Sequence, residues 1–306
     1  HVVGTEYKQV SPFEARKRGA AMVARNIAAH IEREAMALPR TWKPLVYCWR
    51  GGQRSGALAL VLGQIGFEVA VLDGGYQGFR RFVVGDLETL PLDLDLRVIC
   101  GKTGSGKSRL LQSLRVAGAQ VLDLEALASH RGSVLGPLPD EAQPSQKRFE
   151  TLLWQALRAF DRTRPIFAES ESRTVGRLRI PETLLERLRA APCLHLEMPD
   201  EARVALLMED YAHLRLDIPL LCERLHALRE ARGAVVVERW QAMAHAGQIE
   251  ALVAALLSEH YDPSYQRSMS RHFAGFAAAS VVPARNGSAP ELADLAARVI
   301  ALAPRS

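Results

Sequence analysis

The chain has 306 residues, of which 48% are hydrophobic and 24% are charged, a balance that is typical of folded globular domains and excludes disorder along the whole chain. It contains no run that approaches the roughly 18 consecutive apolar residues of a membrane helix, and its N-terminus shows no signal-peptide pattern, so we expect a cytoplasmic protein without a membrane partner. The net charge of +5 permits a polyanionic partner but does not require one.

The first part of the chain places a cysteine between a strand and a helix. A helical pattern covers residues 14–38 and ends at a proline. Residues 45–47 are apolar and predict a short buried strand, which a glycine-rich turn joins to a helical pattern over residues 55–65. Another short strand is predicted over residues 69–72. Cys48 therefore lies at the end of a strand and just before a helix.

A proline and an acidic, leucine-rich stretch at residues 86–95 predict a change of domain, with a first domain over residues 1–90 and a second over residues 91–306. In the second domain the patterns alternate, with strands over residues 96–100, 120–124, 165–168 and 193–196 and helices over residues 107–116 and 146–160. This alternation implies a parallel sheet with right-handed crossovers, so the predicted fold class is α/β. Residues 200–260 predict a helical C-terminal appendage, and the alanine-rich residues after 275 predict a surface helix or a poorly ordered end.

The most specific motif is the octapeptide GKTGSGKS, which matches G-x-x-x-x-G-K-S and lies between a predicted strand and a predicted helix. In such a P-loop the glycines let backbone N–H groups approach a phosphate, Lys107 places a cation between adjacent phosphates, and Ser108 can ligate Mg²⁺. We therefore expect a diphosphate-type ligand, and the motif does not say whether that ligand is a nucleotide. The predicted ligand-binding residues are Gly101, Lys102, Thr103, Gly104, Ser105, Gly106, Lys107 and Ser108.

A carboxylate at the end of a neighbouring strand is expected to complete a magnesium site with Ser108. Asp123 and Glu169 follow two of the predicted strands, although either side chain can instead cap the helix that follows. We take Ser108 and Asp123 as the predicted ligands of Mg²⁺.

The cysteine loop predicts a reactive thiol, because backbone N–H groups and a helix N-terminus stabilise a thiolate. Arg50 and Arg54 add positive charge beside Cys48, so these three residues are predicted to be catalytic. Sulfur-group transfer through a persulfide and phosphate ester hydrolysis through a phosphocysteine both use such a loop. The C-x5-R spacing fits cysteine phosphatases, but Tyr47 stands where those enzymes usually have a histidine, and group transfer is therefore favoured.

Eight sequence blocks together resemble the bacterial tRNA 2-selenouridine synthases, in which a rhodanese domain is joined to a P-loop domain. The blocks follow the family order over nearly the whole chain and include both loops described above. They are GTEYKQ (residues 4–9), YCWRGGQRS (47–55), LDGGYQGFRR (72–81), GKTGSGKS (101–108), DLEALASHRGS (123–133), QPSQKRFE (143–150), ESESRTVGR (169–177) and HYDPSY (260–265).

The resemblance implies a partial rhodanese-like domain followed by a P-loop NTPase-like domain, because the family begins with a strand and an Asp-x-Arg segment that do not precede His1. It implies replacement of sulfur by selenium at C2 of the wobble 2-thiouridine of tRNA, with selenophosphate as co-substrate and selenophosphate synthetase as the supplier of selenium. It also implies transfer of a geranyl group from geranyl diphosphate to the thiouridine sulfur. In this scheme Lys107 assists departure of the diphosphate, and Cys48 delivers selenium as a thiolate or perselenide.

Other polar and aromatic side chains in these blocks are candidates for contacts with tRNA or with a second ligand, although solvated surface loops contain the same residue types. They are Trp49, Arg80, Arg81, His130, Arg131, Gln146, Glu169, Glu171, Arg173 and Arg177. The residues leave three other functions open: a P-loop NTPase or kinase with a degenerate rhodanese-like platform for RNA or a partner, a cysteine phosphatase, and a nonenzymatic carrier of sulfur or selenium.

Overall fold

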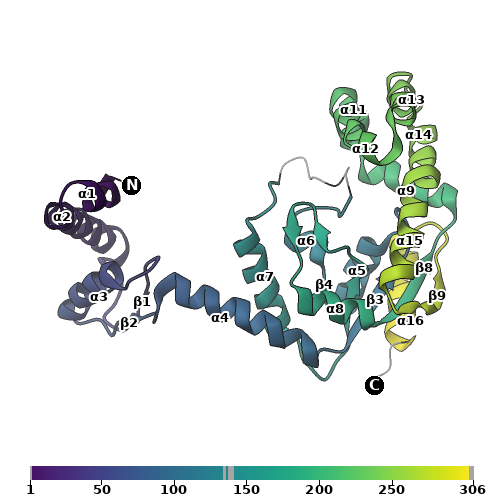
Figure 1. Cartoon of the computed structure of the whole chain (residues 1–306). Helices are drawn as coiled ribbons and strands as arrows, with labels where there is room; N and C mark the ends of the chain where they lie inside the picture. The colour runs from purple at the N-terminus through teal and green to yellow at the C-terminus, as the bar shows by residue number, and fades with distance from the viewer. Residues whose placement is uncertain (1, 134–135, 137–140, 303–306) are drawn as a thin grey trace. The chain divides into compact units, whose positions relative to one another are not determined.

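The structure is a computed structural model that describes residues 2–133, 136 and 141–302. The chain divides into two compact units, His1–Val83 and Val84–Ser306. The division falls within helix α4 (Gly75–Thr89), which is labelled in Figure 1. Each unit is described separately below.

The first unit contains helices and a two-stranded parallel sheet. Its elements are α1 (Val2–Gln9), α2 (Pro12–His30), the π-helical turn η1 (Ile31–Ala35), β1 (Leu45–Val46), α3 (Gln53–Ile65) and β2 (Ala70–Val71). Ser11 caps α2 by accepting a hydrogen bond from the Glu14 amide at 3.4 Å. Val46 and Leu62 are buried and form the centre of a small core between β1 and α3. The order strand, turn, helix around Cys48 is as predicted.

The second unit is built on a five-stranded parallel sheet in the order β4-β5-β3-β8-β9. Its strands are β3 (Leu96–Cys100), β4 (Gln120–Leu122), β5 (Ile166–Glu169), β8 (Pro192–Glu197) and β9 (Gly275–Pro283). In the centre of the sheet, Val98 of β3 pairs with Ala168 on one side and with Cys193 on the other. This arrangement confirms the predicted α/β class and the parallel sheet.

Helices pack on the sheet and supply most of its core. They are α5 (Lys107–Val116), α6 (Leu124–Ala128), α7 (Gln146–Ala159), α8 (Glu182–Ala190) and α16 (Ala289–Leu302), with a 3-10 turn η2 (Leu90–Asp93) and a separate antiparallel pair, β6 (Thr174–Val175) and β7 (Leu178–Arg179). Ile99 of β3 is buried in one cluster with Leu110 and Leu114 of α5 and with Leu295 and Val299 of α16. The helix that follows the lysine motif therefore packs against both the sheet and the last described helix.

The residues after 275 differ from the sequence prediction of a surface helix or poorly ordered end. β9 pairs in parallel with β8, from Leu194 with Ser280 to Glu197 with Pro283, and forms one edge of the sheet. The sequence of β9, GFAAASVVP, is rich in small side chains, and most of them are exposed. Because such a strand has no alternation of apolar and polar residues, the hydrophobic pattern of the sequence does not predict it.

The helices between β8 and β9 form a group with its own core (Figure 1). They are α9 (Asp200–Asp210), α10 (Ala212–Leu216), α11 (Ile218–His226), α12 (Arg229–Arg232), α13 (Ala234–His245), α14 (Ile249–Leu256), the π-helical turn η3 (Leu257–Tyr261) and α15 (Asp262–His272). Trp240 is fully buried in this core with Leu225 and Leu252. The predicted helical appendage is present, but it is an insertion before the last strand and not the end of the domain.

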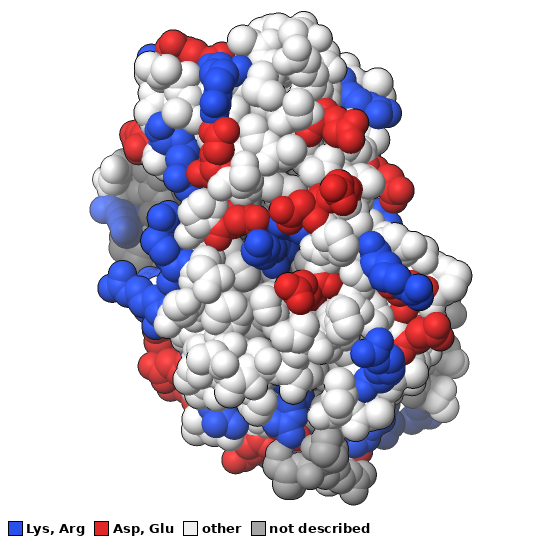
Figure 2. Space-filling view, turned by 90° about the vertical axis from the view of Figure 1, so that its right-hand side faces the viewer, with Lys and Arg blue, Asp and Glu red and all other residues white. Residues whose placement is uncertain are grey.

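Figure 2 shows the face that lies to the right in Figure 1, and on it acidic and basic side chains are interspersed. The described part of the chain contains no helix that combines the length and the apolar character needed to cross a membrane.

Candidate functional site

The anion loop, residues 101–108, joins the end of β3 to the start of α5. Gly104 and Gly106 have φ angles of +79° and +85°, a left-handed conformation that glycine adopts readily. A Cβ atom at Gly104 would also lie 2.8 Å from Leu207 Cδ1. The backbone therefore requires these glycines, and Gly106 leads into the N-terminus of α5, where free N–H groups favour an anion.

Lys107 crosses the anion loop. Its Nζ donates hydrogen bonds to the carbonyl oxygens of Gly101 at 2.7 Å and of Lys102 at 3.2 Å. An ammonium group has three hydrogens, so one remains for a ligand. Lys107 lines an anion pocket with about 1250 Å³ of empty space, partly open to solvent, whose walls include Ser108, Glu125, Arg131, Glu171 and Tyr265.

Three carboxylates lie close to Ser108. Ser108 Oγ donates to Glu125 Oε2 at 3.0 Å, and the Glu125 amide donates to Glu169 Oε1 at 3.1 Å. One carboxylate oxygen from each of Glu125, Glu169 and Glu171 lies within 4.8 Å of the others. Burial is the main cause that raises the pKa of all three groups, and repulsion from neighbouring carboxylates, Asp123 among them, adds to it, so that the pKa of Glu171 is about 8. These oxygens and the Ser108 hydroxyl are the hard ligands that Mg²⁺ prefers.

Asp123, the carboxylate predicted to join Ser108 in a magnesium site, occupies the N-cap of α6. Its Oδ1 accepts a hydrogen bond from the Ala126 amide at 2.9 Å, and Arg115 lies 3.7 Å from its other oxygen. Ser108 instead contacts Glu125, two residues further along the chain. The role of Asp123 as a metal ligand stays a prediction, and Glu125 is a site residue that the sequence pattern did not identify.

The raised pKa of Glu171 predicts a stability that depends on pH. A carboxyl group with a pKa of about 8 in the folded protein and 4.5 when unperturbed binds its proton more tightly in the folded state, so this stabilisation is lost as the pH rises from about 4.5 to 8. We expect the melting temperature of the ligand-free protein to fall between pH 6 and pH 8, and Glu171→Gln to reduce this fall by about 2–4 °C. Scanning calorimetry at the two pH values measures the effect. Glu182→Gln, at an exposed ion pair with Arg173, is the control, and an equal change in both variants would contradict the prediction.

Residues of helices α9 and α15 form hydrogen bonds with the backbone of the anion loop. Arg203 of α9 is fully buried and donates to the Thr103 carbonyl at 2.9 Å and to both oxygens of Asp262, at 2.5 and 3.0 Å. Tyr265 of α15 accepts a hydrogen bond from the Gly101 amide at 2.7 Å. The helical insertion therefore fixes the backbone of the loop through charge-assisted hydrogen bonds.

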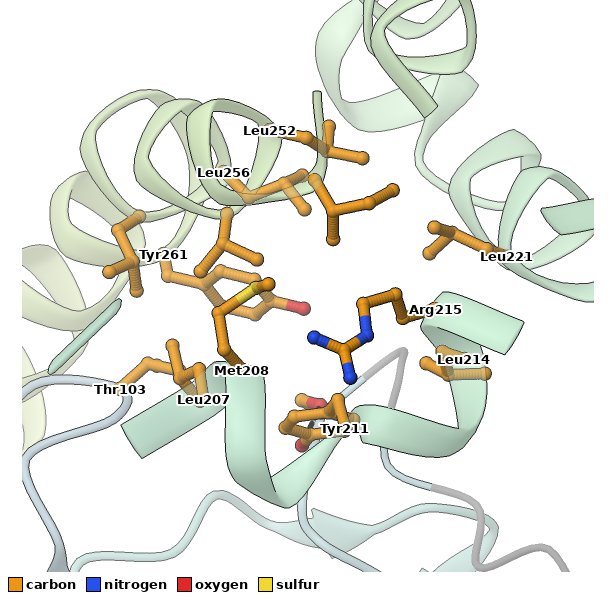
Figure 3. A pocket seen from close by; sticks show the side chains of 14 residues that line it. Thr103, Leu207, Met208, Tyr211, Leu214, Arg215, Leu221, Leu252, Leu256 and Tyr261 are labelled. Atoms are coloured by element: carbon orange, nitrogen blue, oxygen red, sulfur yellow. Dashed lines mark hydrogen bonds between the residues drawn. The ribbon is translucent and has the colours of Figure 1, made fainter. Parts of the chain in front are cut away.

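An apolar cavity adjoins the anion pocket (Figure 3). It is partly open to solvent, and its walls come mainly from α9, α10, α11, α14 and η3. The residues that line both spaces are Thr103, Ser133, Leu207, Tyr211 and Tyr261. A polar space that contains Lys107 and an apolar space thus share one wall.

The predicted residues His130 and Arg131 have different roles in the loop after α6. His130 is buried, and its Nδ1 accepts a hydrogen bond from the Gly132 amide at 3.1 Å. Arg131 lines the anion pocket, stacks over the Tyr211 ring at 5.0 Å and donates to the Asp210 carbonyl. Gly132 has a φ of +64°, and a Cβ there would lie 3.0 Å or less from oxygens of Glu125 and Glu171. The loop therefore passes directly over the carboxylates.

In the first unit, Cys48 follows β1 and is buried, with 9% of its surface exposed. The Ser55 hydroxyl at the start of α3 lies 3.5 Å from the Cys48 sulfur. A hydrogen bond from this hydroxyl to the thiolate is the main cause that lowers the pKa of Cys48 to about 7, and backbone amides and Arg54 act in the same direction, whereas burial opposes them. The thiolate form of Cys48 is therefore more accessible near neutral pH than that of an ordinary cysteine.

Several aromatic and basic residues lie near Cys48 along the chain. Trp49 is 51% exposed and stacks on Tyr76 of α4, with ring centroids 4.9 Å apart. Arg50, Arg54 and Arg81 are exposed, whereas Arg80 is buried. Residues 1–83 contain 12 Lys and Arg against 6 Asp and Glu, compared with 27 against 28 in the remaining residues. The net positive charge of the chain thus lies in the unit that contains Cys48.

Comparison with known proteins places the chain in a family. Residues 94–221 match a family described as "tRNA 2-selenouridine synthase AAA domain". Proteins named tRNA 2-selenouridine synthase from Alcanivorax borkumensis and Marinobacter nauticus are 31% and 33% identical to it, over 89% of this chain and over 82% and 80% of their own lengths. A protein of the same name from Sulfurovum sp. is 31% identical, over 89% of this chain and 81% of its own.

The chain belongs to the tRNA 2-selenouridine synthase family. The resemblance inferred from the eight sequence blocks is confirmed. The residues matched to the family domain contain the anion loop and the three carboxylates, and they extend through Arg203. Asp262, Tyr265 and β9 lie beyond the matched residues, although they support the loop and the sheet.

The structure brings only some of the predicted residues of this family member together. Lys107, Ser108, Arg131 and Glu171 line the anion pocket, and Glu169 contacts Glu125 beside it. Three others, which do not line the pocket, bind neighbouring segments: Gln146 bonds to the Arg179 backbone, Arg173 pairs with Glu182, and Arg177 donates to the Gln143 carbonyl. Contacts of these three residues with RNA stay predictions.

Proposed function

We propose that the chain is a tRNA-modifying transferase that replaces the sulfur of a wobble 2-thiouridine with selenium from selenophosphate, after geranylating that sulfur with geranyl diphosphate. The observation that carries the geranylation step is the wall shared by the anion pocket and the apolar cavity. An amphiphilic diphosphate has an anionic end for the anion pocket and an apolar end for the cavity, whereas the ribose and base of a nucleoside triphosphate carry hydrogen-bonding groups.

The anion loop would act on the diphosphate end of this substrate. The thiouridine sulfur attacks C1 of the geranyl group, the C–O bond breaks, and the diphosphate leaves with the electron pair. Loop N–H groups and Lys107 neutralise the charge that develops on the departing oxygen. Ser108, Glu125, Glu169 and Glu171 fit Mg²⁺, which when bound would supply further positive charge to the leaving group.

The cysteine loop would act in the selenium step. Selenium from selenophosphate adds to C2 of the base, and the C2–S bond breaks to release geranylthiol. The Cys48 thiolate then attacks phosphorus, the Se–P bond breaks with its electron pair left on selenium, and water hydrolyses the phosphocysteine to release phosphate and restore the thiol. The N-terminus of α3, with Arg50 and Arg54, provides positive charge for the phosphate group of the donor. We assign the Cys48 thiolate to the delivery of selenium, on the basis of its lowered pKa and its place in the loop.

The excess of Lys and Arg in residues 1–83 supports contacts with the phosphates of tRNA. A substrate of this kind agrees with a cytoplasmic protein that receives selenophosphate from a selenophosphate synthetase.

Mass spectrometry of nucleosides tests the proposal. A tRNA with 2-thiouridine at position 34 is incubated with the protein and geranyl diphosphate, and then with selenophosphate. We expect a mass that corresponds to S-geranyl-2-thiouridine after the first incubation and 2-selenouridine after the second. If the base is unchanged and the protein hydrolyses ATP or GTP without tRNA, the NTPase alternative replaces the proposal. Hydrolysis of aryl phosphates that depends on Cys48 would instead support the phosphatase.

A further inference from the structure

We infer that Leu221 and Leu252 form the floor of the apolar cavity and set the longest isoprenyl chain that the site accepts. The inference rests on the proposed function, because it takes the ligand to be an isoprenyl diphosphate whose anionic end occupies the anion loop. Beyond that function, it names the side chains that select among isoprenyl diphosphates of different chain length.

The cavity has a polar end and an apolar end. Thr103, the third residue of the anion loop, and Ser133 lie where the cavity meets the anion pocket. Away from them most of the walls are aliphatic, with Leu207 and Met208 on α9 and residues of α11 and α14 opposite, although the Arg215 guanidinium of α10 also points into the cavity (Figure 3). A chain attached to a diphosphate at Lys107 therefore extends toward α11 and α14.

Tyr261 marks the junction between the two ends. It lines both spaces, and its side chain points into the cavity in Figure 3. The Tyr261 hydroxyl is buried, and the Ser133 side chain beside it lies too far away for a normal hydrogen bond. A buried hydroxyl without a partner is costly, so its position indicates a polar ligand atom at the start of the apolar chain.

The two leucines of the floor belong to a packed core, so their side chains cannot move without disturbing that core. Leu221 and Leu252 are 5% and 1% exposed and belong to the buried cluster that contains Trp240 and Leu225. A chain that ends at these side chains fills an apolar space, and each buried methylene adds about fourfold to affinity. A chain longer by one isoprene unit must displace the core, and overpacking of this kind is unfavourable.

The test compares isoprenyl diphosphates of different length. Isothermal titration of the full chain with inorganic pyrophosphate, geranyl diphosphate and farnesyl diphosphate gives three affinities for each variant. For the unmodified protein we expect geranyl diphosphate to bind at least about a hundredfold more tightly than pyrophosphate, and about tenfold more tightly than farnesyl diphosphate. Leu252→Ala is expected to raise the ratio of farnesyl to geranyl affinity about tenfold while pyrophosphate binds as before.

Two further variants keep the inference testable. Leu225→Ala truncates a leucine of the same core that does not line the cavity, so it should reduce stability without changing the ratio. Val253→Phe fills the cavity from a partly exposed position and should weaken geranyl binding without weakening pyrophosphate binding, even if Leu252→Ala does not fold.

The outcomes separate this inference from the proposed function. If pyrophosphate and geranyl diphosphate bind equally well, or if neither Leu252→Ala nor Val253→Phe changes the preference, the cavity does not hold the chain, and the role of the anion loop stands. If neither pyrophosphate nor geranyl diphosphate binds, the diphosphate site itself is wrong, and the inference fails with it.

Discussion

Lys107→Ala is expected to lower the rate of geranylation of 2-thiouridine tRNA by about a hundredfold to a thousandfold and to weaken pyrophosphate binding. The substitution removes the cation that faces the departing diphosphate, and loss of one such group typically costs this much in rate. It also removes two hydrogen bonds to loop carbonyls, at Gly101 and Lys102. Quantification of the geranylated nucleoside by mass spectrometry, with single turnover conditions, measures the rate.

Arg162→Ala is the control, because it removes a cation of the same unit that does not line the anion pocket. The Arg162 guanidinium is exposed and pairs with Asp93 at 3.2 Å. We expect this variant to retain most of the activity. Normal geranylation by Lys107→Ala would show that the loop does not bind the diphosphate.

Cys48→Ala is expected to abolish formation of 2-selenouridine while S-geranyl-2-thiouridine accumulates. The thiol is absent from the proposed geranylation step, so only the second reaction should stop. The two nucleosides are measured in one digest. Cys222→Ala, at a thiol in the helical insertion whose pKa is raised by burial, should behave like the unmodified protein.

The pH profile gives a second measure of the cysteine's role. With a pKa of about 7, the thiolate fraction of Cys48 rises through neutral pH, so the rate of selenium transfer should increase from pH 6 to pH 8. Ser55→Ala removes the hydroxyl that stabilises the thiolate and should move the rising part of the profile to higher pH. A profile that is flat in both proteins, or selenouridine formation by Cys48→Ala at the normal rate, would contradict the assignment.

The sequence predicts elements well where the apolar pattern is strong. β3 was predicted over its observed range because its five residues pack inside a sheet and a glycine ends it. α5 was predicted equally well, because its apolar residues follow the helical period and Gly106 precedes it. β9 was missed since its small side chains lie at an exposed edge, where pairing with β8 and not its own composition determines the structure.

The candidate site is predicted only where a local motif defines it. The positions of Lys107 and Ser108 follow from eight consecutive residues. The pairing of Ser108 with Glu125 depends instead on where α6 begins, because Asp123 is its N-cap and the first turn of the helix brings Glu125 to the loop. The buried Arg203 and the apolar cavity depend on packing between helices, and a helical period shows which residues face inward but not whether they leave a space.

The late position of β9 and α16 in the chain has a consequence for biosynthesis. A ribosome releases the anion loop and α5 long before it releases α16, whose Leu295 and Val299 cover Leu110 and Leu114. Until then the part of the apolar surface of α5 that α16 covers is exposed, and a nascent chain presents such surfaces to chaperones and to aggregation. The anion loop therefore gains its full support only once α16 has been released, and substitutions in α16 should reduce the yield of folded protein although α16 does not line the anion pocket.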